Sequence, residues 1–246
     1  MDKDTRNRIE HATQSARSLL EQDFADQLEG TFDIRLDGTL APEPGSHLDA
    51  AQRVLRRKLV AAIRHRSSVV SHQSSAGRSS TDDRRLTTED TAAAVASYLR
   101  EAAFTTLNRF VALKMLEARD LVQECISRGE QSAGFKEFCG LAPGLVQLPD
   151  HGYRLYIESL FDELSTEVKV LFDRRDPHSM LWPSRAIFEG LLDILNADEL
   201  ADVWGEDETI GWVYQFFNGQ DERRKMREQS QAPRNSRELA VRNQFF

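Results

Sequence analysis

The first thirty residues carry apolar side chains every three or four positions, with charged side chains between them. That spacing places the apolar residues along one stripe of an α-helix. The pattern therefore predicts a helix over residues 3–29. Its apolar stripe consists of Ile9, Ala12, Ala16, Leu20, Phe24 and Leu28.

A turn-rich segment follows this helix. Asp37-Gly38 and the Pro42–Gly45 stretch contain residue types that favour turns. Three apolar residues alternate with polar ones before the first turn, and Leu40 follows it. This alternation predicts a short β-hairpin. The three apolar residues are Phe32, Ile34 and Leu36.

A second helix is predicted from Ser46, its expected cap, to about Arg64, with Asp49 in the first turn. Its apolar stripe consists of Leu48, Leu55, Leu59 and Ile63. Its other faces are strongly basic, with Arg53, Arg56, Arg57, Lys58, Arg64 and Arg66 against the single acid Asp49. Residues 67–81 are rich in serine, which predicts a linker over 67–87.

The longest predicted helix covers residues 88–118, opening at Thr88, with Thr87 and Thr91 as alternative caps. Two of its faces are apolar. One carries Val95, Leu99, Ala102, Thr106, Phe110 and Leu113, and the other Phe104, Leu107, Val111 and Met115. A helix that is apolar on two sides is typical of a buried element. We expect it to be the spine against which the other helices pack.

Helical spacing returns in four later segments, at 151–172, from Trp182-Pro183 to Leu195, at 198–204 and at 207–218. Strands do not alternate with helices anywhere in the pattern. The predicted fold is therefore mainly α, a multi-helix domain around the central 88–118 helix with a helical N-terminal arm. The expected divisions are an arm at 1–66, the linker at 67–87, a helical module at 88–220 and a basic connector at 221–246.

Charge is unevenly distributed around the net value of −8. Residues 87–220 hold 11 basic and 23 acidic residues, whereas residues 221–246 hold 7 basic and 4 acidic. Phosphate binding depends on Lys and Arg, so the acidic middle is a poor surface for nucleic acid and the two ends are better ones. Possible DNA contacts are Arg53, Arg57 and Arg64 in the arm, and Arg223, Arg224, Lys225 and Arg227 in the tail.

Each basic segment also has a simpler interpretation. The second helix could present a solvated face, and arginines of the tail could pair with the acidic middle. The aromatic residues Trp204, Trp212, Tyr214, Phe216 and Phe217 could stack on bases, but their spacing fits core packing better.

The sequence contains no complete catalytic motif. It has no P-loop, no G-x-G-x-x-G, no H-E-x-x-H and no G-x-S-x-G, and it has no Pro-Pro pair. The six histidines share no ligand spacing, and acidic pairs such as Asp162-Glu163 and Asp207-Glu208 point apart on predicted helices. We interpret these residues as structural or solvated, and expect no metal site and no cofactor in this chain.

The sequence predicts a cytoplasmic protein. Cys125 and Cys139 stand alone without metal-ligand or disulfide spacing. The N-terminus is charged and lacks the apolar segment of a secretion signal. No apolar run approaches the ~18 residues of a membrane span.

Two stretches resemble a known family. AFTTLNRFVALKMLEAR (103–119) and DETIGWVYQFFN (207–218), the second followed by a charged segment and ELAVRNQFF, resemble the region before the catalytic core of adenine-specific DNA methyltransferases of the BREX and DISARM phage-defence systems (the PglX-like family). In that family a Gln-aromatic-aromatic-Thr-Pro motif opens the core. Gln244, Phe245 and Phe246 match its first three positions.

The resemblance implies a non-catalytic N-terminal helical part of a larger enzyme. The parent enzyme would transfer a methyl group from S-adenosylmethionine to a flipped-out adenine. The family's cofactor loop and its Asn/Asp-Pro-Pro-aromatic motif have no counterpart here, so no catalytic residue carries over. DNA and other defence-system subunits are the implied partners. Asn108 and Arg109 lie within the first stretch, and we expect them to hold neighbouring helices together rather than to contact DNA.

A different class of function also fits the sequence. A free-standing helical protein could bind another protein through the acidic middle and have no role on DNA.

Overall fold

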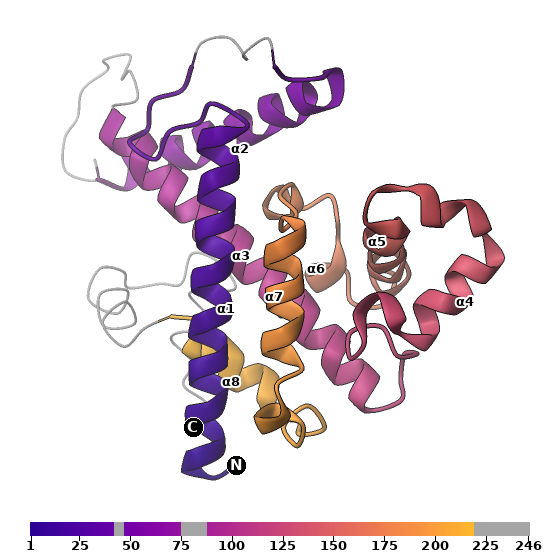
Figure 1. Cartoon of the computed structure of the whole chain (residues 1–246). Helices are drawn as coiled ribbons and strands as arrows, with labels where there is room; N and C mark the ends of the chain where they lie inside the picture. The colour runs from indigo at the N-terminus through magenta and orange to yellow at the C-terminus, as the bar shows by residue number, and fades with distance from the viewer. Residues whose placement is uncertain (42–46, 75–87, 219–246) are drawn as a thin grey trace. The chain divides into compact units, whose positions relative to one another are not determined.

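The computed structural model describes residues 1–41, 47–74 and 88–218, and over these ranges it is mainly helical (Figure 1). Extended backbone pairs there at a single isolated antiparallel bridge, between Ile34 and Leu40. The mainly α prediction is confirmed, and the predicted hairpin is reduced to one bridge. In chain order the helices are α1 (Lys3–Gly30), α2 (Ala50–Ser74), α3 (Thr88–Ala118), α4 (Ala133–Leu141), α5 (Tyr153–Leu164), α6 (Lys169–Phe172), α7 (Arg185–Leu195) and α8 (Thr209–Phe216).

Five short 3₁₀ helices connect these elements within the described ranges. They are η1 (Gly129–Gln131), η2 (Pro143–Gln147), η3 (Pro149–Gly152), η4 (Pro177–Ser179) and η5 (Asp198–Leu200).

The chain forms two compact units, each assembled from separate segments of the sequence. Of the described residues, unit 1 contains Met1–Leu19, Thr106–Phe172 and those from Arg185 to Asn218, and unit 2 contains those within Leu20–Thr105 and Asp173–Ser184. Helices α1 and α3 therefore contribute residues to both units.

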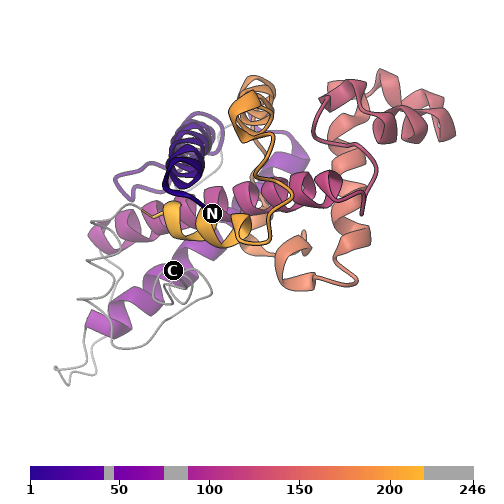
Figure 2. The same cartoon turned by 90° about the horizontal axis from the view of Figure 1, so that it is seen from below.

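The core of unit 1 surrounds the second half of α3. The side chains of Gln14 and Arg17 donate hydrogen bonds to the carbonyl oxygens of Phe216 and Phe217, the latter at 2.7 Å, so α8 lies beside the first half of α1 (Figure 2). Buried apolar side chains from five helices fill this core, including Ile9, Leu107, Phe110, Val111, Leu113, Ile157, Phe161, Leu191, Leu195, Val213 and Phe217.

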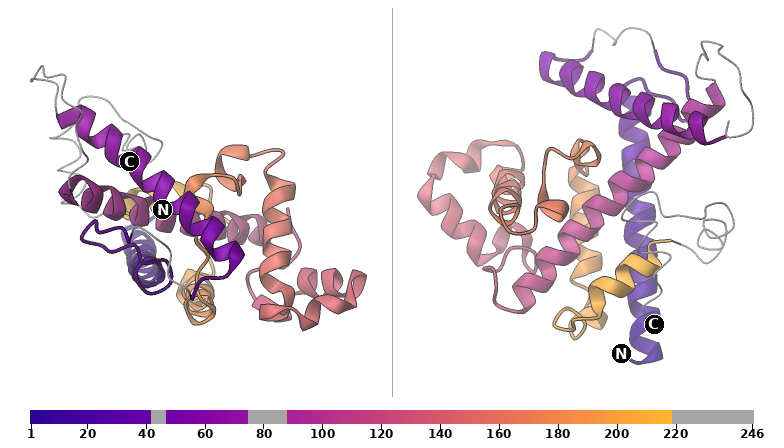
Figure 3. Two further views of the ribbon diagram at one scale, coloured as in Figure 1. Left: turned by 90° about the horizontal axis from the view of Figure 1, so that it is seen from above. Right: turned by 180° about the vertical axis from the view of Figure 1, so that it is seen from behind.

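The core of unit 2 combines the second half of α1, α2, the first half of α3 and the segment 173–184. The Asp23 carboxylate accepts a hydrogen bond from the backbone amide of Ser184 at 3.0 Å, and the Gln27 amide donates to the Trp182 carbonyl at 2.9 Å. Buried apolar side chains include Leu20, Phe24, Leu28, Ile34, Leu59, Ile63, Val95 and Tyr98. Figure 3 shows α2 beside the start of α3.

The turn at Asp37-Gly38 has to contain glycine. The φ angle of Gly38 is +88°, and a Cβ atom at this position would lie 2.6 Å from the backbone nitrogen of Ala92 in α3. Both the backbone conformation and the close approach exclude a side chain.

Helix α2 differs from the prediction at both ends. Asp49 is the capping residue, because its carboxylate accepts from the Gln52 amide at 2.8 Å while the Gln52 side chain accepts from the Asp49 amide at 2.9 Å. This is a capping box. The predicted cap, Ser46, lies outside the described residues. The helix continues to Ser74, through residues predicted to start the linker, and Ser67 is fully buried on its inner face.

The predicted 151–172 helix is two helices, α5 and α6. The hydroxyls of Ser165 and Thr166 donate to the carbonyl oxygens three residues earlier, at 2.8 Å each. Such bonds compete with the helical pattern and favour its end. Val168 lies between the two helices and is 45% exposed. The central helix was predicted accurately, since α3 spans Thr88–Ala118.

Candidate functional site

Helix α2 presents the most uneven distribution of charge in the described chain. Its 25 residues include six Lys and Arg side chains and no Asp or Glu. Leu59 and Ile63 are fully buried on its inner face. The burial of these side chains fixes the rotation of the helix about its axis. This rotation determines which of the basic side chains are buried and which are exposed.

Arg56 points into unit 2 and not toward solvent. It is 5% exposed, its Nε donates to the carbonyl of Phe32, and one terminal nitrogen donates to the carbonyl of Ala41, each at 2.6 Å. These carbonyls flank the Ile34–Leu40 bridge. Arg56 therefore anchors the turn segment to α2.

Arg66 also has partners within unit 2. Its guanidinium donates to the Ser97 hydroxyl at 2.6 Å and lies 3.7 Å from the Glu101 carboxylate, both on α3. A terminal nitrogen lies 3.3 Å from Nε2 of His178, whose Nδ1 is 3.0 Å from the Asp176 carboxylate. Both ring nitrogens of His178 thus have protein partners, which favours the structural interpretation of this histidine.

Four basic side chains of α2 remain exposed, namely Arg53, Arg57, Lys58 and Arg64. Arg53 donates from Nε to the Leu48 carbonyl at 2.9 Å. None of the four forms an ion pair within the ranges that the structure describes. The three arm residues named as DNA contacts are thus accessible cations. The four tail residues, Arg223, Arg224, Lys225 and Arg227, lie outside the described residues.

A second polar cluster, which the sequence analysis missed, is buried in unit 1. Lys114 of α3 is 10% exposed, and its ammonium donates to the Ser127 hydroxyl and to the side-chain oxygen of Asn196, each at 2.6 Å. The Asn196 amide in turn donates to the Ile126 carbonyl at 3.0 Å. This cluster joins the end of α3, the 124–128 loop and the end of α7. The one sequence signal for this cluster is the spacing of Lys114 and Glu117, three residues apart on a helix. The same spacing is common on solvated helix faces, so it does not predict burial.

Glu117 occupies the centre of this cluster. Its carboxylate accepts backbone hydrogen bonds from Cys125 and Ile126 at 2.6 Å and from Ser127 at 3.1 Å, and it accepts the Ser127 hydroxyl as well. Burial acts to raise the pKa of Glu117, but these hydrogen bonds outweigh it and hold the pKa below its ordinary value. Every oxygen is satisfied by the protein itself, so the cluster is a structural one.

Two groups beside Glu117 are shifted the other way, toward their neutral forms. Burial lowers the pKa of Lys114, and the neighbouring Glu117 only partly opposes this. Burial together with the Glu117 charge raises the pKa of the Cys125 thiol well above its ordinary value. A thiol held protonated is a poor nucleophile. Tyr153 is buried against the Cys125 carbonyl, to which its hydroxyl donates.

Arg109 has the internal role that its position in an apolar helix predicted. It is 5% exposed, its Nε donates to the Leu171 carbonyl at 2.7 Å, and its guanidinium lies 5.5 Å from the ring centre of Phe161. It therefore joins α3 to α5 and α6. Its neighbour in the sequence, Asn108, is also buried, but no described residue donates a hydrogen bond to its side-chain oxygen.

Three of the five aromatic residues between Trp204 and Phe217 are buried in the core of unit 1. Trp204, Trp212 and Phe217 are 4%, 6% and 0% exposed, so they are not available to stack on bases. Trp212 stacks on Phe216 with ring centres 5.3 Å apart, and the guanidinium of Arg6 lies over the Trp212 ring. Core packing is the interpretation that these positions support.

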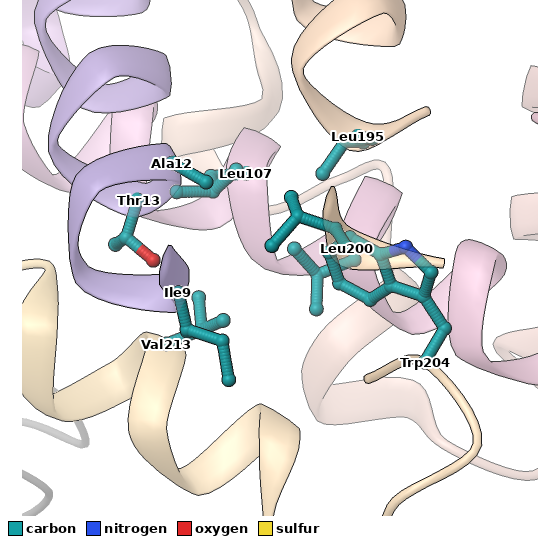
Figure 4. A pocket seen from close by; sticks show the side chains of 9 residues that line it. Ile9, Ala12, Thr13, Leu107, Leu195, Leu200, Trp204 and Val213 are labelled. Atoms are coloured by element: carbon teal, nitrogen blue, oxygen red, sulfur yellow. The ribbon is translucent and has the colours of Figure 1, made fainter. Parts of the chain in front are cut away.

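A small cavity in unit 1 is lined almost entirely by apolar side chains (Figure 4). The lining residues are Ile9, Ala12, Thr13, Leu107, Val111, Leu195, Leu200, Trp204 and Val213. A nucleoside cofactor needs several polar groups converging on it. This cavity offers the hydroxyl of Thr13 and the indole of Trp204 at most.

Comparisons with protein-family models, with curated proteins and with solved structures found no match. Among the described side chains, no three or more His, Cys, Asp or Glu residues are grouped so as to hold a metal ion. No described helix is both long enough and apolar enough to span a bilayer.

Proposed function

We propose that this chain is the non-catalytic N-terminal helical part of an adenine-specific DNA methyltransferase of a phage-defence system. In this proposal the catalytic core, with its S-adenosylmethionine loop and its catalytic motif, is encoded after Phe246. The enzyme works on DNA in the cytoplasm, and other subunits of the defence system are its partners. The helical part supports the core and supplies cationic contacts to DNA.

One observation supports the proposal most. The two stretches that resemble the methyltransferase family lie far apart in the sequence, yet both contribute to the core of unit 1. Leu107 and Val111 from the first stretch and Val213 from the second line the same cavity (Figure 4). Stretches that form one core are expected to occur together in a family, because each needs the other to bury its apolar side chains.

The exposed cations of α2 support a role on DNA. Neutralising backbone phosphates supplies most of the affinity of sequence-independent DNA binding. In a chain of net charge −8, a 25-residue helix without a single acid is the part suited to that contact.

A methyl-transfer assay tests the proposal. The protein containing this chain and the region encoded after Phe246 is incubated with labelled S-adenosylmethionine and duplex DNA. We expect label on the exocyclic amine of adenine, and none when adenine is replaced by its N6-methylated form. Absence of transfer, together with a downstream region that lacks a glycine-rich cofactor turn, refutes the assignment.

A protein-interaction module without a DNA role is the second candidate, and an exposed apolar segment favours it. Residues 138–149 contain no charged side chain. Leu141 is 82% exposed, Val146 50% and Leu148 44%, and Leu155 of the neighbouring α5 is 43% exposed. Exposed apolar patches are typical of interaction surfaces. This candidate predicts no salt-dependent DNA binding, and an association with a protein partner that Leu141→Ser weakens.

A further inference from the structure

We propose that the exposed face of α2 binds the phosphate backbone of double-stranded DNA without reading its bases. The inference rests on the proposed DNA role and specifies the form of DNA and the kind of contact.

Three arginines of α2 form a single stripe. At 3.6 residues per turn, Arg57 and Arg64 lie within about 40° of Arg53 around the helix axis. At 1.5 Å per residue, the stripe extends about 16 Å from Arg53 to Arg64, close to the rise of five nucleotides of one strand. Arginine is suited to this task because its planar guanidinium can donate two parallel hydrogen bonds to a phosphate.

The inner face of α2 holds this stripe in position. Leu59 and Ile63 are buried, Arg56 is bonded to two carbonyls of the turn segment, and Arg66 is bonded to Ser97 of α3. The exposed cations therefore lie on a helix that is already held in place. Binding should cost little backbone entropy as a result.

The composition of the exposed face indicates duplex DNA and not single strands. Proteins that bind single strands stack bases on aromatic side chains, and α2 contains no Phe, Tyr or Trp. The exposed neutral residues near the cations include Ala51 and Ala61, whose side chains are small. The Gln52 side chain, which could read a base edge, is bonded to the backbone of Asp49.

An anionic membrane surface suits this face less well. A helix that lies in a membrane interface buries a large apolar face in the lipid. Between Ala50 and Ser67 the one large apolar side chain that is well exposed is Val54, at 42%.

The test is fluorescence anisotropy of the full 246-residue chain with labelled DNA at several salt concentrations. The probes are two duplexes of unrelated sequence and one single strand of matching length, and binding to vesicles of anionic phospholipid is measured in parallel. We expect both duplexes to bind with affinities within about two-fold of each other and the single strand more weakly. Three phosphate contacts predict a slope of log affinity against log salt near −3, hence about a fifty-fold loss from about 50 to 200 mM.

Two variants localise the contact. Arg57→Gln and Arg64→Gln should each make the salt slope shallower by about one unit, equally for both duplexes. Arg154→Gln removes the same charge from an exposed side chain of α5 and should leave the slope unchanged. Circular dichroism checks that each variant keeps the helical content of the unmodified chain.

Different failures have different meanings. Tighter binding to the single strand, a preference for one duplex sequence, or tighter binding to anionic vesicles than to DNA overturns the inference. A duplex salt slope that Arg57→Gln and Arg64→Gln leave unchanged, but that neutralising Arg223 and Arg224 makes shallower, overturns it while the proposed methyltransferase role stands. If the intact protein transfers methyl groups but this chain binds no duplex, the α2 inference is wrong and the proposed methyltransferase role stands.

Discussion

The ammonium of Lys114 lies 2.6 Å from the side-chain oxygen of Asn196, which joins the end of α3 to the end of α7 across 82 residues of sequence. The same ammonium lies 3.7 Å from the Glu117 carboxylate. Buried charges at such a junction are stable only while each has its partner. The stability of unit 1 therefore depends on the buried pair of Lys114 and Glu117.

Replacing Glu117 tests this dependence. Glu117→Gln removes the negative charge and leaves the buried Lys114 ammonium without a counter-ion, which should lower the free energy of unfolding by about 2–4 kcal/mol. The measurement is urea denaturation followed by circular dichroism. Glu189→Gln is the control, because Glu189 pairs with Arg185 on an exposed surface and its loss should cost less than about 0.5 kcal/mol. Equal effects of the two substitutions would contradict the role of the cluster.

The same carboxylate predicts how stability varies with pH. Its pKa is lower in the folded chain than its ordinary value of 4.5. The contribution of Glu117 is therefore fully present above the pKa of the unfolded chain and is lost as the pH falls through the folded value. Urea midpoints measured from pH 6 down to pH 3 should fall less steeply in Glu117→Gln than in the unmodified chain. Parallel curves would contradict the prediction.

Two glycines of α4 should respond in opposite ways to alanine. A Cβ atom at Gly134 would clash with the Tyr156 hydroxyl and lie 2.9 Å from the Glu124 carbonyl, whereas a Cβ atom at Gly140 meets nothing within 4 Å. Gly134→Ala should destabilise by about 1–3 kcal/mol through overpacking. Gly140→Ala should stabilise by about 0.5–1 kcal/mol, because alanine favours the helix. Thermal unfolding of both variants distinguishes the two effects, and stabilisation by Gly134→Ala would show that the approach of Tyr156 is not tight.

The apolar cavity should accept one added methylene. Val111 lines the cavity, and Val111→Ile should leave stability unchanged or raise it by up to about 0.5 kcal/mol. Val95 is fully buried and does not line this cavity, so Val95→Ile should cost about 1–3 kcal/mol. The denaturation midpoint should fall in Val95→Ile and stay the same or rise in Val111→Ile, relative to the unmodified chain. A loss of stability as large for Val111→Ile as for Val95→Ile would mean that the space is not available to a side chain.

Substitutions of two neighbouring arginines of α2 should have different effects, one on stability and the other on DNA binding. Arg56 is buried against two carbonyl oxygens and Arg57 is exposed. Arg56→Ala should lower stability by about 2–4 kcal/mol, since it leaves buried carbonyls unpaired, whereas Arg57→Ala should change it by less than about 0.5 kcal/mol. Duplex affinity at low salt should instead fall in Arg57→Ala. If Arg57→Ala unfolds the chain, the assigned orientation of α2 is wrong.

The sequence predicted the helices well where burial alone determines them. Helix α3 has apolar residues on two faces, and its predicted bounds match those observed. The internal role of Arg109 followed from the cost of burying a guanidinium without partners. Both the bounds of α3 and the role of Arg109 could be predicted because the local sequence pattern and the tertiary packing favour the same structure.

Features that depend on partners distant in sequence were not predictable. The periodic pattern did not distinguish Arg56 and Arg66 from the other cations of α2, because their burial depends on Phe32, Ala41 and Ser97. The Glu117 cluster depends on backbone amides of a loop, which carry no sequence signal. The end of α5 at Ser165 could not be predicted, because the sequence does not show which hydroxyls donate hydrogen bonds to the backbone.

In the proposed role this chain binds DNA through a cationic surface and does not bind S-adenosylmethionine. Both parts can be measured by isothermal titration of the chain with each ligand in turn. We expect binding heat with duplex DNA that weakens steeply with added salt, and no binding heat with S-adenosylmethionine up to about millimolar concentration. Saturable binding of S-adenosylmethionine by this chain alone, or duplex binding that is indifferent to salt, would contradict it.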